Sequence, residues 1–143
     1  MAGFSAKFSA DKYGKPVVKG DFGFFIECLN GLPGPYIKDF VDKLGIKRFL
    51  ELIKDENNRR AYLVYVLAYC EPGKEPVIFT SRFDGVLVNK LRSSEKWFTD
   101  AFLPDGQKLT MGEMRDQDKE GDFEFFGDVE NKFAEWYNKQ KLL

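Results

Sequence analysis

An uninterrupted apolar run constrains the fold more than any other feature of this sequence. Residues 61–70 (AYLVYVLAYC) carry no charged side chain and are rich in residues that favour strands. The run is too short to span a bilayer, and it predicts a central strand buried on both faces. The turn sequence at 71–74 (EPGK) leads into another stretch of strand-forming residues at 77–88. We therefore expect 77–88 to lie antiparallel beside 59–70.

Helical spacing occurs on both sides of this predicted hairpin. Phe4 and Phe8 are spaced for one face of a short helix that Gly14 and Pro16 would end. Two more helices are expected over 36–44 and 46–53, separated by Gly45. A terminal helix is predicted to start near Asp122, and its apolar stripe would consist of Phe126, Val129, Phe133, Trp136 and Tyr137.

Shorter extended segments complete the predicted order of elements. Residues 17–29 read as a strand with a bulge or bend at Asp21, which lies between Gly20 and Gly23. A short strand is expected over 100–103, and Thr110 and Glu113 have the spacing of a helix capping box. The whole pattern predicts an α/β fold in a single domain, residues 1–143.

Composition excludes several classes of function. The 22 basic and 23 acidic side chains nearly cancel, which argues against binding to nucleic acid or to acidic lipid. The chain contains no His, so His-based triads, His-ligated zinc and His acid–base chemistry are excluded. The N-terminal residues lack the apolar segment of a signal peptide. We therefore expect a soluble, cytoplasmic protein whose two cysteines are reduced.

Several segments, in their order along the chain, resemble motifs of the non-canonical purine nucleoside triphosphate pyrophosphatases (the inosine/xanthosine triphosphate pyrophosphatase family). Residues 29–36 (LNGLPGPY) are similar to the family loop A-L-N-G-x-P-G-x-Y-S, and 15–24 (KPVVKGDFGF) resemble G-K-P-V-x-x-[ED]-D-[ST]-G-L. Arg59 and Arg60 stand where the family has an R-R-A-x-F strand. Residues 102–114 resemble the family ending F-x-P-x-G followed by K-T-x-A-E-M.

This resemblance implies an elongated mixed β-sheet with packed helices and a substrate cleft between two lobes. It also implies a hydrolase of nucleotide metabolism that needs Mg²⁺ and releases pyrophosphate from inosine or xanthosine triphosphate. Such chemistry uses carboxylates to hold the metal and orient a water molecule. The small-molecule partner would therefore be a nucleotide.

The sequence departs from the family pattern in ways that predict an N-terminally truncated, degenerate member. It begins after the family's first strand and first helix and lacks the [ST]-x-N-x-x-K phosphate loop. Gly20 replaces the first acidic residue of the [ED]-D pair, so only Asp21 remains. The base-pocket segment G-F-G-Y-D-P is reduced to residues 96–100 (KWFTD), and the purine-reading S-H-R motif is absent. We therefore expect weak selectivity for inosine over adenine bases.

Asp21 is the residue that the resemblance assigns to catalysis and to metal binding. It would orient the water molecule or ligate Mg²⁺. The alternative is a structural role, because Asp tolerates a bend and bonds its own backbone. A single carboxylate is also a poor Mg²⁺ site, since oxygen ligands normally occur in groups.

Four further residues are candidates for substrate binding. Trp97 and Phe98 could stack on a base, although packing in the core or in a loop is the favoured interpretation in a chain so rich in Phe. Asp100 matches the family's late Asp only with a one-residue gap. Lys119 lies where the family has a Lys near the nucleobase, and its alternative is a solvated charge within 116–122.

Three functions and one assembly state follow as hypotheses. The first function is a pyrophosphohydrolase with reduced or altered activity, and the second is a catalytically inactive nucleotide-binding or interaction module on the same fold. The third is a hydrolase of other phosphate or carboxylic esters. Loss of the first strand and helix would expose a strand edge and apolar surface, which predicts a homodimer.

Overall fold

The computed structural model describes residues 1–93, 97–118 and 129–142. The helices and strands, in chain order, are α1 (Ala2–Tyr13), β1 (Val17–Ile26), the 3-10 helix η1 (Glu27–Leu29), β2 (Pro33–Gly34), α2 (Ile37–Leu44), α3 (Ile46–Leu52), β3 (Arg60–Cys70), β4 (Val77–Leu87), the 3-10 helix η2 (Phe98–Asp100), β5 (Phe102–Pro104), α4 (Met111–Gln117) and α5 (Val129–Lys141). No helix among these is both long and apolar enough to cross a bilayer.

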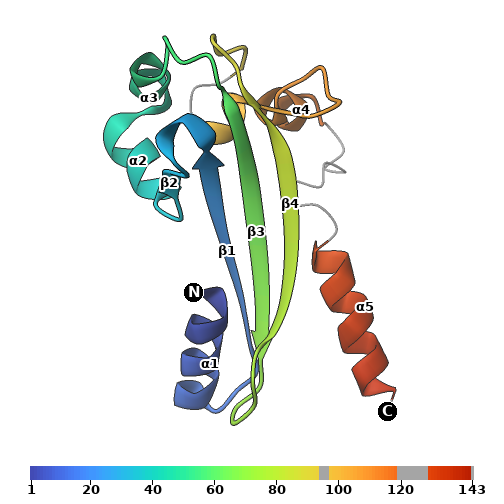
Figure 1. Ribbon diagram of the computed structural model, residues 1–143. Helices are drawn as coiled ribbons and strands as arrows, with labels where there is room; N and C mark the ends of the chain where they lie inside the picture. Colours follow the sequence, from blue (N-terminus) through green and yellow to red (C-terminus); the bar gives the residue numbers. More distant parts are fainter. Residues whose placement is uncertain (94–96, 119–128, 143) are drawn as a thin grey trace. The chain divides into compact units, whose positions relative to one another are not determined.

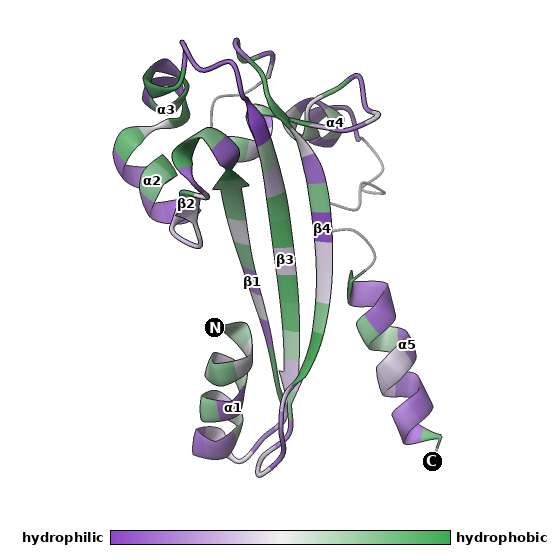
Figure 2. Ribbon diagram, in the orientation of Figure 1, coloured by the Kyte–Doolittle hydropathy of each residue, from purple (hydrophilic) through white to green (hydrophobic). Residues whose placement is uncertain are grey.

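The five strands form one sheet in the order β2-β1-β3-β4-β5, so the long apolar run lies at its centre. No residue of β3 is exposed, and Figure 2 shows that this strand is hydrophobic along most of its length. In Figure 1, β3 runs opposite to both β1 and β4. The outer strands are short and also antiparallel, with Phe24 opposite Gly34 and Gly85 opposite Pro104. The predicted α/β class and the central hairpin are both confirmed, but the sheet is antiparallel and not mixed as expected.

The described residues divide into two compact units, and each is described separately. The first consists of Met1–Phe22, Val64–Arg82 and Phe126–Leu143, and the second of Gly23–Leu63 and Phe83–Phe125.

In the first unit, α1 packs through alanines and not through its phenylalanines. Ala2, Ala6 and Ala10 are buried in one cluster with Ala68 and Cys70. Small side chains let the helix backbone approach the sheet closely. The predicted helix end is confirmed at Gly14, whose φ of 63° is left-handed and whose N–H bonds the carbonyl of Ala10.

Helix α5 belongs to the same unit and packs through an aromatic cluster. Tyr69 of β3 has ring-centroid distances of 5.5, 5.7 and 5.6 Å to Phe133, Trp136 and Tyr137. This contact confirms the predicted stripe for these three residues. Phe126 and the predicted helix start near Asp122 lie outside the described residues.

Two sequence-based boundaries are corrected by the structure. The strand expected over 17–29 is β1, which is continuous through Asp21 but ends at Ile26, because residues 27–29 form the 3-10 helix η1. Asp100 belongs to the 3-10 helix η2 and not to a strand, and β5 begins at Phe102. The reason is local: the Asp100 carboxylate accepts a hydrogen bond from the Trp97 N–H, which closes a tight turn.

Candidate functional site

The turn that carries three of the predicted substrate residues is held by one buried carboxylate. Asp100 is fully buried. Its oxygens accept from the Trp97 N–H at 2.8 Å, from the Ser93 hydroxyl at 2.9 Å and from Arg115 Nη2 at 2.9 Å. All three donors are used to fix the chain around η2. These contacts give Asp100 a positioning role within the second unit, and its contact with substrate stays a prediction.

Arg115 reaches Asp100 from α4. Burial lowers the pKa of Arg115, but the hydrogen bond to Asp116 and the charge of Asp100 raise it by more, so that the net shift is upward. Helix α4 begins with the predicted capping box, in which Thr110 and Glu113 exchange hydrogen bonds of 2.8 and 3.1 Å. Glu113 is thus used as a cap.

Gly112 provides the space in which Asp100 meets α4. A Cβ at position 112 would lie 2.0 Å from Asp100 Oδ1 and 2.8 Å from the Ser93 hydroxyl oxygen. Real Cβ atoms do not approach other atoms so closely. Any larger residue at Gly112 would therefore displace the carboxylate that holds the turn.

The two aromatic candidates on this turn differ in exposure. Phe98 is 2% exposed and packs against Phe24 with ring centroids 5.0 Å apart, so it belongs to the core. Trp97 is 41% exposed, which leaves part of its indole accessible to a planar ligand. Between Phe98 and Asp100, the hydroxyl of Thr99 is buried and has no hydrogen-bond partner among the described residues.

Asp21 lies in the first unit, on β1. It is partly exposed, and its Oδ1 accepts a hydrogen bond of 3.0 Å from the adjacent Phe22 N–H. The residue lines a cavity of about 660 Å³ between the start of α1 and β1, with Phe4, Ser5 and Lys19 among its neighbours. The carboxylate is therefore partly accessible from this cavity.

Tyr65 occupies the space beside Gly20, where the resemblance expects an acidic side chain. A Cβ at position 20 would lie 2.5 Å from the Tyr65 hydroxyl oxygen. Burial, followed by the negative charge of Glu130, raises the pKa of Tyr65, so the phenol is neutral at pH 7. A second carboxylate next to Asp21 would have to displace this ring.

A magnesium site needs several oxygen ligands together. Throughout the described part of the chain, no three Asp, Glu, His or Cys side chains come close enough to hold a metal ion. Asp21 alone does not form such a site. The residues present therefore do not fit a metal held by the protein by itself.

The structure brings Phe98 and Asp100 together on η2, with Trp97 at its N-cap, whereas Asp21 belongs to the other compact unit. Lys119 lies outside the described residues. Arg115 and Tyr65 were missed by the sequence analysis. In the sequence, Arg115 stands out only as a basic residue in the helix that follows the turn. Tyr65 stands out only as a tyrosine within an apolar strand.

Residues 2–121 match the Ham1 family. The chain is 38% identical over 138 residues to a dITP/XTP pyrophosphatase of Methanopyrus kandleri, covering 96% of this chain and 73% of that protein. It is 39% identical over 119 residues to a dITP/XTP pyrophosphatase of Methanosarcina acetivorans, covering 83% of this chain and 64% of the relative.

Solved structures show the same fold at lower sequence identity. The Ham1 protein of Staphylococcus aureus superposes with a TM-score of 0.81 at 20% identity, covering 97% of this chain and 75% of that one. A HAM1 protein from Coxiella burnetii gives a TM-score of 0.80 at 20% identity, with coverages of 96% and 75%.

Proposed function

The chain belongs to the Ham1 family, and from this we propose that it is a nucleoside triphosphate pyrophosphohydrolase that acts on non-canonical purine nucleotides. The observation that carries the proposal is the match over residues 2–121, together with relatives at 36–39% identity that are named dITP/XTP pyrophosphatases. The chain spans 64–73% of the length of these relatives. Its activity on the same nucleotides is therefore a proposal.

The proposed reaction converts a nucleoside triphosphate and water into a nucleoside monophosphate and pyrophosphate. The water oxygen forms the new bond to phosphorus, and the bond between the first and second phosphates breaks. Asp21 is the residue that we assign to accepting the proton of that water, because its carboxylate is partly exposed and lines an open cavity.

The base of the nucleotide is assigned to Trp97. Its indole is 41% exposed on a turn that Asp100 and Arg115 hold rigidly. A rigid aromatic face loses little conformational freedom when a purine stacks on it. In this proposal the buried ring of Phe98 anchors the turn in the core. Asp100 holds the same turn in place through its hydrogen bond from the Trp97 N–H. Lys119 remains a candidate for contacting the base.

Mg²⁺ enters the proposal only as the cation that accompanies the triphosphate. Mg²⁺ commonly keeps several waters and is bound through one or two carboxylates together with substrate phosphates. Asp21 could contribute one such carboxylate. No step of the reaction is assigned to the metal, since the described residues do not assemble a site for it.

A second candidate function is nucleotide binding without turnover. The observation in its favour is that Gly20 and Tyr65 leave no room for a second carboxylate beside Asp21. On this alternative the stacking surface at Trp97 would still bind a base, but water would not be activated.

We also propose that the protein is a cytoplasmic homodimer. Large apolar side chains of the first unit are exposed, including Phe4 at 80%, Phe8 at 59% and Tyr13 at 65%. These residues share one helix, α1, and such surfaces commonly mark interfaces. A second copy of the chain is the simplest partner for them.

The test is a panel of triphosphates, namely those of inosine, deoxyinosine, xanthosine and adenosine, each assayed with Mg²⁺ by detection of pyrophosphate. Release of pyrophosphate together with the monophosphate supports the proposal. Thermal stabilisation by a triphosphate without any release of pyrophosphate would support the second candidate function, nucleotide binding without turnover. Release of orthophosphate, or turnover of unrelated esters only, would contradict both.

A further inference from the structure

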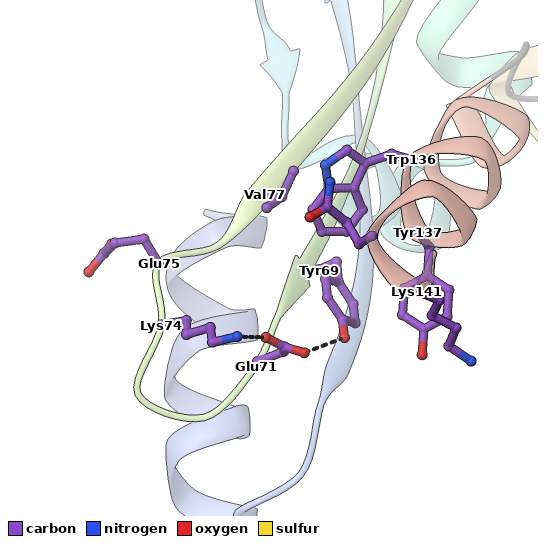
Figure 3. Close-up of a pocket in the computed structure, with 9 residues that line it drawn as sticks. Tyr69, Glu71, Lys74, Glu75, Val77, Trp136, Tyr137 and Lys141 are labelled. Atoms are coloured by element: carbon purple, nitrogen blue, oxygen red, sulfur yellow. Dashed lines mark hydrogen bonds and ion pairs between the residues drawn. The ribbon is translucent and has the colours of Figure 1, made fainter. Parts of the chain in front are cut away.

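Two helices cover the two faces of the sheet in the first unit. Ala68 and Cys70 of β3 are buried in one cluster with α1, whereas Tyr69 between them contacts Trp136 and Tyr137 of α5 (Figure 3). Successive residues of a strand point to opposite faces of a sheet, so α1 and α5 pack on opposite faces. Both faces are therefore covered, which leaves the strand edges as the accessible part of this sheet.

The outer edge of β1 has no strand beside it over Val17–Asp21. Within the described part of the chain, the strand on that side is β2, which pairs with β1 only from Phe24 onward. Val18, Lys19 and Gly20 are exposed one after another, although a strand covered on one face exposes alternate residues, as most of β4 does. The backbone N–H and C=O groups along such an edge can pair with another strand.

The charges along this edge can be matched by a second copy of the chain. Lys19 and Asp21 are two residues apart and both line the cavity beside α1, so they project from the same face. In an antiparallel pair centred on Gly20, Lys19 of each copy lies opposite Asp21 of the other. Opposite charges at facing positions stabilise a strand pair, and like charges destabilise it. A pair centred on Lys19 or on Asp21 would bring two like charges together.

Gly20 removes the side chains that would otherwise meet at the centre of this pair. A Cβ at position 20 would lie 2.5 Å from the Tyr65 hydroxyl oxygen of the same chain, so the phenol fills the place of a side chain there. Glycine within a strand often marks the close approach of another backbone. Two facing Gly20 residues bring no identical side chains into contact at a two-fold axis.

Helix α1 adds an apolar surface at the same place. Phe4 is 80% exposed and lines the cavity together with Lys19, Gly20 and Asp21, so it lies next to this stretch of the edge. A two-fold axis perpendicular to the sheet keeps the α1 helices of both copies on one face. The Phe4 side chains would then lie on either side of the axis, where they can bury apolar surface against the other copy.

We propose that two copies of the chain associate by antiparallel pairing of their β1 edges about a two-fold axis through Gly20. This inference rests on the proposed homodimer and names its contact surface. The backbone supplies the hydrogen bonds, as in other recognition by strand addition, and the two pairs of Lys19 with Asp21 set the register. The second copy thereby brings an ammonium group to the carboxylate that we assign to proton transfer.

Charge reversal tests the register. In a dilution series followed by light scattering coupled to size exclusion, Lys19→Glu and Asp21→Lys should each raise the dissociation constant of the dimer about tenfold, because both pairs become repulsive. The double variant, which exchanges the two charges, should return to within about threefold of the parent protein. Lys38→Glu on α2 makes the same charge change at another exposed position and should stay within about twofold.

Hydrogen exchange tests the backbone contact. Amides on the outer side of Val17–Asp21 should exchange at least about fivefold more slowly above the dissociation constant than below it, whereas a dimer held by α1 alone would not protect them. Single reversals without effect, a double variant that does not restore association, or amides that are not protected on dimerisation would each overturn the edge pairing and leave the homodimer in place. A parent protein that is a monomer at all concentrations would overturn both.

Discussion

Arg115 Nη2 donates to Oδ1 of Asp100 across 2.9 Å, and this pair ties helix α4 to the turn that presents Trp97. The carboxylate is fully buried, whereas the Arg115 side chain is 32% exposed. Burial of a polar group without partners is costly, so the three hydrogen-bond donors around Asp100 offset the cost of burying its side chain. The pair thus supports the turn that presents Trp97.

Replacement of Arg115 by Met should destabilise the fold. The variant leaves Asp100 buried without its cation, so we expect a loss of about 2–3 kcal/mol of unfolding free energy in urea denaturation. Asp116→Asn is the control, because it removes the exposed carboxylate of the same arginine. It should cost less than about 1 kcal/mol. Equal losses in the two variants would show that Asp100 does not need Arg115.

Gly20 and Tyr65 should be coupled energetically. Gly20→Ala places a Cβ 2.5 Å from the Tyr65 hydroxyl oxygen, and such overpacking typically costs about 1–3 kcal/mol. In a Tyr65→Ala background the same substitution should cost at least about 1 kcal/mol less, as measured by a double-mutant cycle. Additive effects would contradict the proximity of the two side chains.

We expect substitution of Trp97 to weaken nucleotide binding and substitution of Phe98 to lower the stability of the fold. Trp97→Ala should raise the KM for inosine triphosphate about 5- to 30-fold, a loss of about 1–2 kcal/mol of stacking, while leaving the melting temperature almost unchanged. Trp97→Phe retains an aromatic face and should stay within about threefold of the parent protein. Phe98→Ala should instead destabilise the fold by about 3–5 kcal/mol, because its ring is buried. Normal KM in Trp97→Ala would remove Trp97 from the base site.

The exposed phenylalanines of α1 should mediate self-association. At micromolar concentration, light scattering coupled to size exclusion should give twice the chain mass of 16.5 kDa. Phe4→Ser combined with Phe8→Ser should shift the protein to a monomer without unfolding it, since both side chains are exposed. A parent protein that elutes as a monomer would refute the dimer.

Much of the fold was predictable because its signals are local. The apolar run at 61–70, the turn at 71–74, Gly14 and the Thr110–Glu113 pair each set a structure through their nearest neighbours. The packing face of α1 was harder to foresee. Its phenylalanines have helical spacing, yet the alanines are buried because only small side chains allow close approach to β3.

The candidate site was less predictable because its contacts join distant segments. Asp100 was predicted to bind substrate, but its partners Ser93 and Arg115 could not be foreseen, because they lie 7 and 15 residues away. Tyr65 fills the space at Gly20 across neighbouring strands. No periodicity marks such pairs, and only the three-dimensional arrangement identifies them.

Pyrophosphate release from inosine triphosphate, compared between the parent protein and Asp21→Asn, tests both the proposed hydrolase activity and the role of Asp21. Asp42→Asn, an exposed carboxylate on α2, is the matched control. We predict release in the parent, weak preference over adenosine triphosphate, full activity in Asp42→Asn, and a loss on the order of 10²–10⁴ in kcat for Asp21→Asn without a change in melting temperature. Unchanged turnover in Asp21→Asn, or no pyrophosphate from any triphosphate in the parent protein, would contradict the proposal.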